Sequence, residues 1–242
     1  SPAGEAVPYG TSIYEHQVPA ARGEDQAKQH DHWQQQKTAN KQKLERISSG
    51  LTYAEVLEQE MELSNQRLHD NADAFETGQR ALLRSLGVDE NAVMQEDLHE
   101  PVPIGAAGRK FLLDAFQNNY QDMAGNPMPF PGLTEEDFRH VGVIWVNPDK
   151  DPVLARQMRD LGLPVRPFAM LTVDPAHWKE FERKLGHEGS AGFAEIAERF
   201  HPDSQLRQNG VTGLFFLRYT DSFTDARSNI IHEYNHLLDP LS

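Results

Sequence analysis

The residues best suited to chemistry stand together near the end of the sequence, at His232-Glu233-Tyr234-Asn235-His236. Two histidines four positions apart lie on one face of an α-helix, where their ring nitrogens can bind one metal ion. Glu233 sits at the edge of that face, and its carboxylate can take a proton from a zinc-bound water and later deliver it to a leaving amine. The pattern predicts zinc ligands at His232 and His236 and a general base at Glu233.

The context of this motif makes a chance match less plausible. The sequence contains 11 His in 242 residues, so chance produces such a pattern in roughly a few per cent of chains of this composition. Here Ile230 and Ile231 precede the motif, and Leu237 and Leu238 follow it. The predicted helix therefore has an apolar back and a polar front.

The stretch from Gly213 to His236 resembles the zincin metallopeptidases, in which an edge strand lines the substrate cleft and the next helix carries the HExxH motif. The resemblance covers about the last thirty residues. It implies that His232 and His236 bind zinc and that Glu233 is the general base. It also implies that a protein or peptide substrate lies as an extra strand along residues 213–219.

The third zinc ligand is less evident than the first two, although a catalytic zinc takes three protein ligands. Six residues follow His236, and Asp239 is the sole metal-binding side chain among them. In a continued helix its Cα would lie about 7–8 Å along the axis from the midpoint of the histidines, which is too far. Pro240 disfavours helical angles at the preceding residue, so the helix should end near Leu238 and Asp239 can turn back toward the metal.

The identity of the third ligand stays open at this point. Asp239 can instead only end the helix, and His187 or His201 can approach the site from loops upstream. The sequence can also stop short of its natural end, with the third ligand beyond it.

The alternative functions follow from the state of the metal site. If the site is incomplete, the chain is an interaction or assembly protein rather than an enzyme. A zinc hydrolase acting on a small amide is a further alternative.

Alternation of strands and helices predicts an α+β or mixed α/β fold with a small sheet over residues 109–242. The resemblance implies that this domain is zincin-like. The domain is expected to have two or three layers. We expect strands at 141–146, 166–173 and 213–219. We expect helices at 111–120, 152–161, from the cap Asp174 through Leu185, at 191–200 and at 224–238.

The first part of the sequence is expected to differ in character. Residues 1–18 are rich in Pro and Gly and predict an extended arm. A helical extension is expected over 19–87, with one helix over 20–48 and a second over 52–86. Thr52 and Glu55 form a capping box for the second helix, and Gly87 is a suitable stop. Residues 88–108 are expected to be a linker.

The composition limits the classes of molecule that the chain is expected to bind. The net charge of -14 argues against binding to nucleic acid or anionic membranes but leaves open a basic protein partner or substrate. The absence of cysteine excludes disulfides and thiolate ligands and leaves the redox compartment open. No apolar run approaches the ~20 residues that span a bilayer. In style the chain is similar to secreted bacterial effector or toxin proteases, which implies secretion, although a cytoplasmic protein would share these features.

Overall fold

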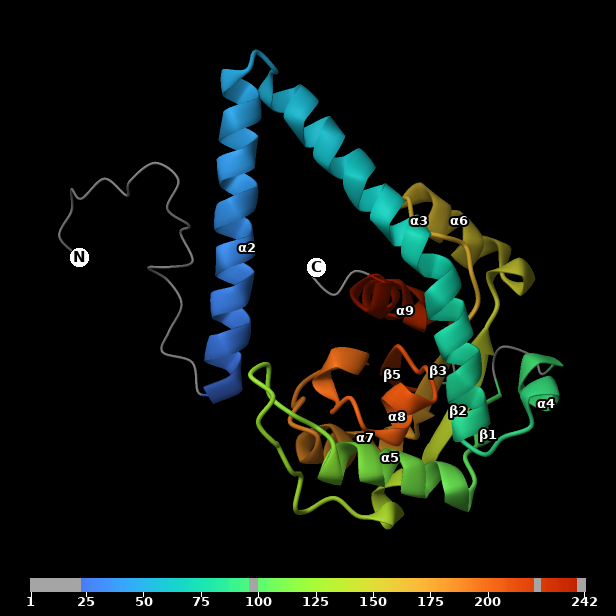
Figure 1. Ribbon diagram of the computed structural model, residues 1–242. Helices are drawn as coiled ribbons and strands as arrows, with labels where there is room; N and C mark the ends of the chain where they lie inside the picture. Colours follow the sequence, from blue (N-terminus) through green and yellow to red (C-terminus); the bar gives the residue numbers. More distant parts are fainter. Residues whose placement is uncertain (1–22, 96–99, 220–222, 239–242) are drawn as a thin grey trace. The chain divides into compact units, whose positions relative to one another are not determined.

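The computed structural model describes residues 23–95, 100–219 and 223–238 (Figure 1). In these ranges the chain forms eight α-helices and one five-stranded sheet, which confirms the predicted mixed α+β class. The predicted arm at 1–18 and the candidate ligand Asp239 lie outside these ranges.

The α-helices are α2 (Gly23–Ser48), α3 (Tyr53–Ser85), α4 (Glu90–Gln95), α5 (Ala106–Asn118), α6 (Pro152–Asp160), α7 (Pro175–Lys184), α8 (Gln205–Gln208) and α9 (Phe223–Leu238). The strands are β1 (Val102–Pro103), β2 (Val141–Val146), β3 (Phe168–Val173), β4 (Gly192–Ile196) and β5 (Gly213–Arg218). The 3-10 helices are η1 (Glu135–Phe138), η2 (Pro148–Lys150) and η3 (Ala197–Arg199).

The chain divides into two compact units. The first comprises residues 1–64 and 122–126, and the second comprises residues 65–121 and 127–242. In the first unit, α2 and the start of α3 correspond to the two predicted helices. The predicted capping box is present, because the Thr52 amide donates to the Glu55 carboxylate at 2.8 Å and the Glu55 amide donates to the Thr52 hydroxyl at 3.2 Å. None of the helices in the described ranges is long and apolar enough to cross a membrane.

The second half of α3 belongs to the second unit because its apolar side chains pack into the core of that unit. Its residues Leu68 and Phe75 pack into one core cluster, and Leu82, Leu83 and Leu86 pack into another. The division of the chain therefore falls at residue 65, inside a continuous helix. Residues 88–108, expected as a linker, contain α4 and β1, and β1 pairs with β2.

The sheet has the strand order β1-β2-β3-β5-β4. β3 and β5 are parallel, and the other three pairs are antiparallel. The predicted strands at 141–146 and 213–219 are therefore present as β2 and β5, and the strand predicted at 166–173 begins slightly later, as β3. β4 stands at the end of the described sheet and has one strand neighbour, β5.

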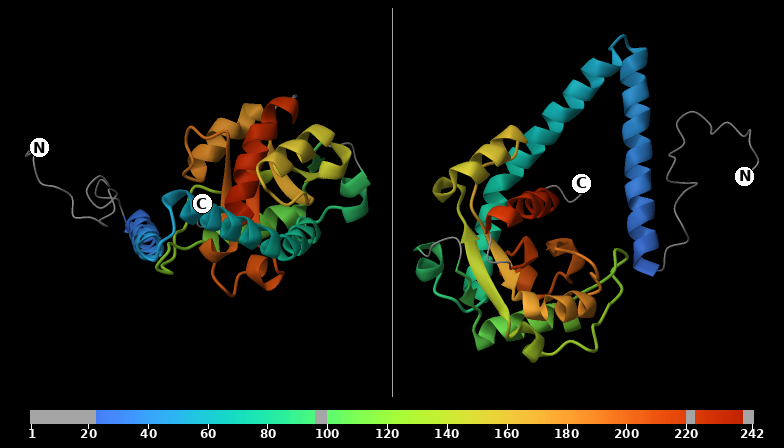
Figure 2. Two further views of the ribbon diagram at one scale, coloured as in Figure 1. Left: turned by 90° about the horizontal axis from the view of Figure 1, so that it is seen from above. Right: turned by 180° about the vertical axis from the view of Figure 1, so that it is seen from behind.

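Helices cover both faces of the sheet, so the second unit has three layers. Alternate residues of β2, β3 and β5 face opposite sides, as the two-residue period of a strand requires. One face packs against α5 and α7, and the other packs against α6, α9 and the middle of α3. Figure 2 (left) looks down on this second face, with α9 lying across it.

One predicted element is wrong. We expect a helix over residues 191–200 from the sequence, but these residues form β4 and the 3-10 helix η3. Pairing with β5 from Gly192 to Ile196 decides the outcome, because it buries Phe193 and Glu195 on one side of the strand. The predicted role of residues 213–219 as the edge of the cleft is also wrong, because β5 lies between β3 and β4 and is paired on both sides.

Candidate metal centre

The helix that carries the motif, α9, is held on the sheet by its apolar face, as the sequence predicts. Seven of its side chains are buried: Phe223, Ala226, Ile230, Ile231, Tyr234, Leu237 and Leu238. The phenol of Tyr234 donates to the carbonyl of Pro164 at 2.9 Å, and burial raises its pKa. Its ring stacks on Phe168 with centroids 4.7 Å apart. Tyr234 is therefore a packing residue that fixes the rotation of α9 about its axis.

An ion pair fixes the first half of α9. The Arg227 guanidinium donates to both carboxylate oxygens of Asp151, at 3.0 and 3.3 Å. Asp151 also caps α6 by accepting from the amides of Val153 and Leu154. Both side chains are largely buried, at 16% and 7% exposure. Arg227 is thus engaged within the fold, one turn before the motif.

Replacing Arg227 with methionine is expected to lower the free energy of unfolding by about 1–3 kcal/mol, because the buried Asp151 carboxylate loses its cation. Urea unfolding followed by tryptophan fluorescence measures this loss. Arg183→Met is the matched control, since the Arg183–Glu180 pair is 54% and 58% exposed and such pairs contribute at most about 1 kcal/mol. Equal losses in the two variants would contradict a special role for Arg227.

The last turn of α9 approaches the sheet at a glycine. A Cβ at Gly213 would lie 2.5 Å from the Leu237 side chain and 3.2 Å from the Glu195 carbonyl oxygen. The absence of a side chain at the start of β5 therefore allows the end of α9 to settle on the strand.

A Gly213→Val substitution is expected to destabilise the protein by about 1–3 kcal/mol, because the added atoms overfill this contact. The midpoint of thermal unfolding should fall accordingly. Gly132→Val serves as the control, because a Cβ at Gly132 would meet nothing within 4 Å. A Gly213→Val protein as stable as the control would show that the contact adapts without cost.

The two histidines of the motif converge. The Nε2 atoms of His232 and His236 lie 2.9 Å apart, and the rings stand nearly perpendicular, at 86°. Two nitrogens bound to one tetrahedral zinc at about 2.0–2.1 Å lie roughly 3.3 Å apart. In this contact one nitrogen donates a hydrogen to the other, so the rings would have to turn as well as separate to direct both lone pairs at one ion. His232 is exposed and His236 is half-buried, so the pair faces solvent.

Glu233 lies beside this pair and is half-buried. Burial raises the pKa of its carboxyl, and the positive charge of His236, His232 and His187 opposes that rise. A raised pKa makes a carboxylate a stronger base near neutral pH.

The described residues bring together two of the predicted metal ligands and the predicted base. Within residues 23–95, 100–219 and 223–238, no group of three or more His, Asp or Glu side chains is arranged to hold a metal ion. Asp239 is outside these ranges, so its role stays a prediction. The donor set present is a pair of nitrogens that matches two positions of a zinc site.

The two upstream histidines have other partners in the structure. His187 Nε2 lies 2.7 Å from the Glu195 carboxylate, and His201 Nδ1 accepts from the Asp203 amide at 3.1 Å. The buried Glu195 also accepts from the Tyr120 hydroxyl at 3.1 Å. A histidine held by a carboxylate through one nitrogen presents a fixed second nitrogen. Sequence reasoning missed Glu195 because it placed this residue on a helix.

The edge strand β4 borders the same region. α9 packs against both β4 and β5. Its backbone amides and carbonyls on that edge have no strand neighbour among the described residues. A free edge of this kind can pair with an extended peptide.

Comparisons with models of protein families, with curated proteins and with solved structures gave no match for this chain.

Proposed function

We propose that the chain is a zinc-dependent hydrolase, and most specifically a metallopeptidase that cleaves protein substrates. The observation that carries this proposal is the convergence of the His232 and His236 Nε2 atoms, 2.9 Å apart, beside the half-buried Glu233. Two imidazole nitrogens with an adjacent carboxylate are the components that metal-assisted hydrolysis requires. The donor set therefore supports a zinc ion held by α9.

Each residue of the motif has a distinct role in this proposal. His232 and His236 hold the ion through Nε2, and zinc when bound supplies a Lewis acid that lowers the pKa of a water molecule to about 7. Glu233 takes the proton of the attacking water and then delivers it to the leaving amine. The raised pKa of Glu233 suits this double task, because the same group must accept and release a proton.

We propose Asp239 as the third ligand. It directly follows Leu238, the last residue of α9, and precedes Pro240. Proline disfavours helical angles in the residue before it, which supports a change of chain direction at Asp239. His187 is the upstream alternative from the sequence, but its ring stacks on Phe193, which belongs to the face of the sheet that packs against α5 and α7.

Substrate binding is proposed at the free edge of β4. An extended segment of a protein can pair with this strand through backbone hydrogen bonds, which are independent of sequence. β5 cannot take this role, because β3 and β4 occupy both of its edges. The peptide would then pair with a strand that α9 contacts.

Metal analysis combined with proteolysis tests the proposal. The purified chain, passed through a desalting column to remove weakly held ions, is expected to contain about one zinc per molecule by mass spectrometry. It should cleave an unfolded protein, a chelator should stop cleavage, and added zinc should restore it. A chain that binds zinc in far less than equal amount and cleaves nothing would refute the proposal.

A second candidate function is that of an interaction or assembly protein with an incomplete metal site. It is favoured by the absence of a third ligand among the described residues. The same measurements separate the two candidates. Chelator-sensitive proteolysis excludes the second, whereas a zinc-free and inactive chain supports it.

A further inference from the structure

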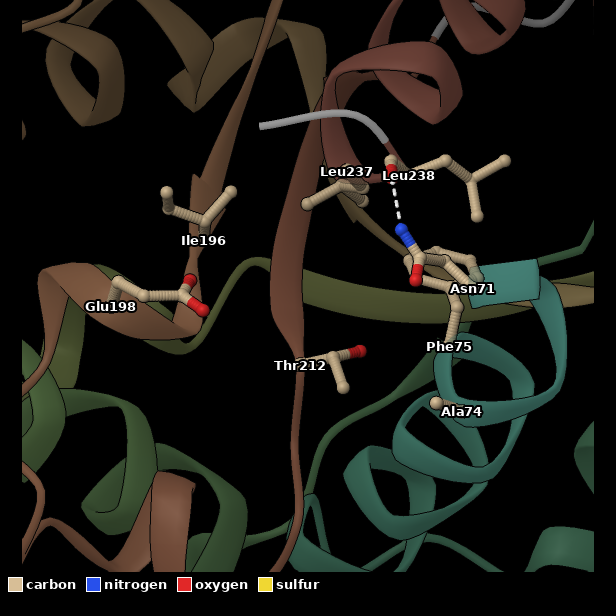
Figure 3. Close-up of a pocket in the computed structure, with 8 residues that line it drawn as sticks. All are labelled: Asn71, Ala74, Phe75, Ile196, Glu198, Thr212, Leu237 and Leu238. Atoms are coloured by element: carbon tan, nitrogen blue, oxygen red, sulfur yellow. Dashed lines mark hydrogen bonds between the residues drawn. The ribbon is translucent and has the colours of Figure 1, made fainter. Parts of the chain in front are cut away.

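A pocket lies at the C-terminal end of α9 (Figure 3). Its walls come from the second unit: Phe75 on α3, Ile196 at the end of β4, and Leu237 on α9. Its volume is about 230 Å³. Pockets for drug-sized molecules occupy about 300–1,000 Å³. The space therefore suits a single long side chain better than a separate small molecule.

The polar groups of this pocket are mainly acceptors. The Glu198 side chain is exposed, and its carboxylate has neither a hydrogen bond nor an ion pair within the described part of the chain. Figure 3 shows this carboxylate directed toward the side where Thr212 and Leu237 lie. The Thr212 hydroxyl oxygen is buried and has no partner there. The Asn71 amide already donates to the Leu238 carbonyl, at 3.4 Å. Of the described residues that line the pocket, none is Lys, Arg or His.

A second unpaired acceptor lies next to the pocket. Gln79 is fully buried, and its amide nitrogen donates to the carbonyl of Gly213, the residue after Thr212, at 3.1 Å. Its amide oxygen has no partner among the described residues. Buried acceptors without donors are costly, and a ligand that brings an N–H group relieves that cost at Thr212, which lines the pocket.

Apolar walls with a carboxylate at the mouth match one kind of side chain. Lys and Arg place an aliphatic stem against apolar surface and keep a cationic, donor-rich head at the end. The stem would contact Phe75, Ile196 and Leu237, and the head would meet Glu198. A purely apolar side chain would leave the carboxylate and the hydroxyl unpaired.

The position of the pocket relates it to the proposed substrate-binding strand β4. Ile196, in the wall of the pocket, is the last residue of β4, and Leu237 lies on α9, which contacts β4. A substrate paired with β4 would therefore reach the wall of the pocket where the strand ends.

We propose that this pocket selects a Lys or Arg side chain of the protein substrate. The inference rests on the proposed function and adds the class of substrate, a basic segment. The net charge of -14 supports it, because an acidic protein attracts basic segments over long range.

The test measures binding without cleavage. Fluorescein-labelled alanine-based peptides carrying one Lys, one norleucine or one Glu are titrated against the full chain with Glu233→Gln, and fluorescence anisotropy gives the Kd. Norleucine keeps the aliphatic stem and lacks the charge. The Lys peptide is expected to bind about threefold to fivefold more tightly than the norleucine peptide, because its ammonium pairs with an exposed carboxylate.

A second substitution assigns the preference to the pocket. Adding Glu198→Gln should remove the preference for Lys and leave the norleucine peptide unchanged. Adding Glu135→Gln, which makes the same charge change at an exposed position of η1, should preserve it. Equal or undetectable binding of the Lys and norleucine peptides, or a Lys preference that survives Glu198→Gln, would overturn the inference.

The outcome is separable from that of the proposed function. Chelator-sensitive cleavage by the unsubstituted chain together with no preference for Lys would reject the pocket assignment alone. A preference that depends on Glu198 in a chain that neither binds zinc nor cleaves protein would reject the hydrolase and keep the basic-segment site.

Discussion

A Glu233→Gln protein is expected to lose about 10²–10⁴-fold in kcat while it still binds one zinc. The amide has the shape of the carboxylate but cannot take a proton from water, and Glu233 is not one of the proposed ligands. Rates of cleavage of an unfolded protein and zinc content measured on the same sample test both parts of this prediction.

The control for this substitution is Glu135→Gln, an exposed glutamate of η1 that should leave both quantities unchanged. Loss of zinc together with activity would mean that Glu233 helps to hold the metal. Full activity in Glu233→Gln would remove the residue from the mechanism.

The second large effect is expected at the histidine pair. His236→Ala should weaken zinc binding by more than about 100-fold, since loss of an outer-shell partner alone typically costs 10–100-fold. The Nε2 atoms of the pair meet at the exposed side of α9, so the fold itself should change little. Competition with a fluorescent zinc chelator measures affinity, and circular dichroism measures the fold.

His201→Ala provides the comparison, because His201 is also exposed and its ring nitrogen accepts a backbone amide in a loop. It should retain zinc affinity. Equal affinities in His236→Ala and His201→Ala would show that the convergence of the two rings has no role in metal binding.

Local signals were sufficient for much of the fold. The run of apolar residues at 141–146 is buried on every residue and forms β2. Asp174 accepts from the Ala176 amide and begins α7, as its residue type predicts. The spacing of apolar residues predicts α9 to within one residue at its start. In these segments, propensity, period and capping all favour the same structure.

β4 could not be predicted in the same way. Its sequence from Gly192 to Ile196 is followed by Ala-Glu-Arg-Phe, and Phe193, Ile196 and Phe200 recur at helical spacing. Pairing with β5, a strand later in the sequence, overrides this pattern. The error had a consequence for function, because it assigned the edge of the sheet to the wrong strand.

The candidate functional residues also differ in whether the sequence alone could predict them. The positions of His232, Glu233 and His236 follow from helical geometry, which is local. The pocket lined by Glu198, Phe75 and Leu237 is assembled from α3, the end of β4 and the end of α9, which are far apart in the sequence. No spacing rule connects such residues, so only the folded chain reveals them.

The parallel pairing of β3 with β5 also bears on the order of folding. The two strands are neighbours in the sheet, yet α7, β4 and α8 separate them along the chain. Such non-local pairing forms slowly compared with local contacts. α9 packs on β5. The surface that buries the apolar face of α9 therefore exists only after β5 has joined the sheet. Zinc bound there would act late, raising the stability of an already folded state by mass action rather than starting its assembly.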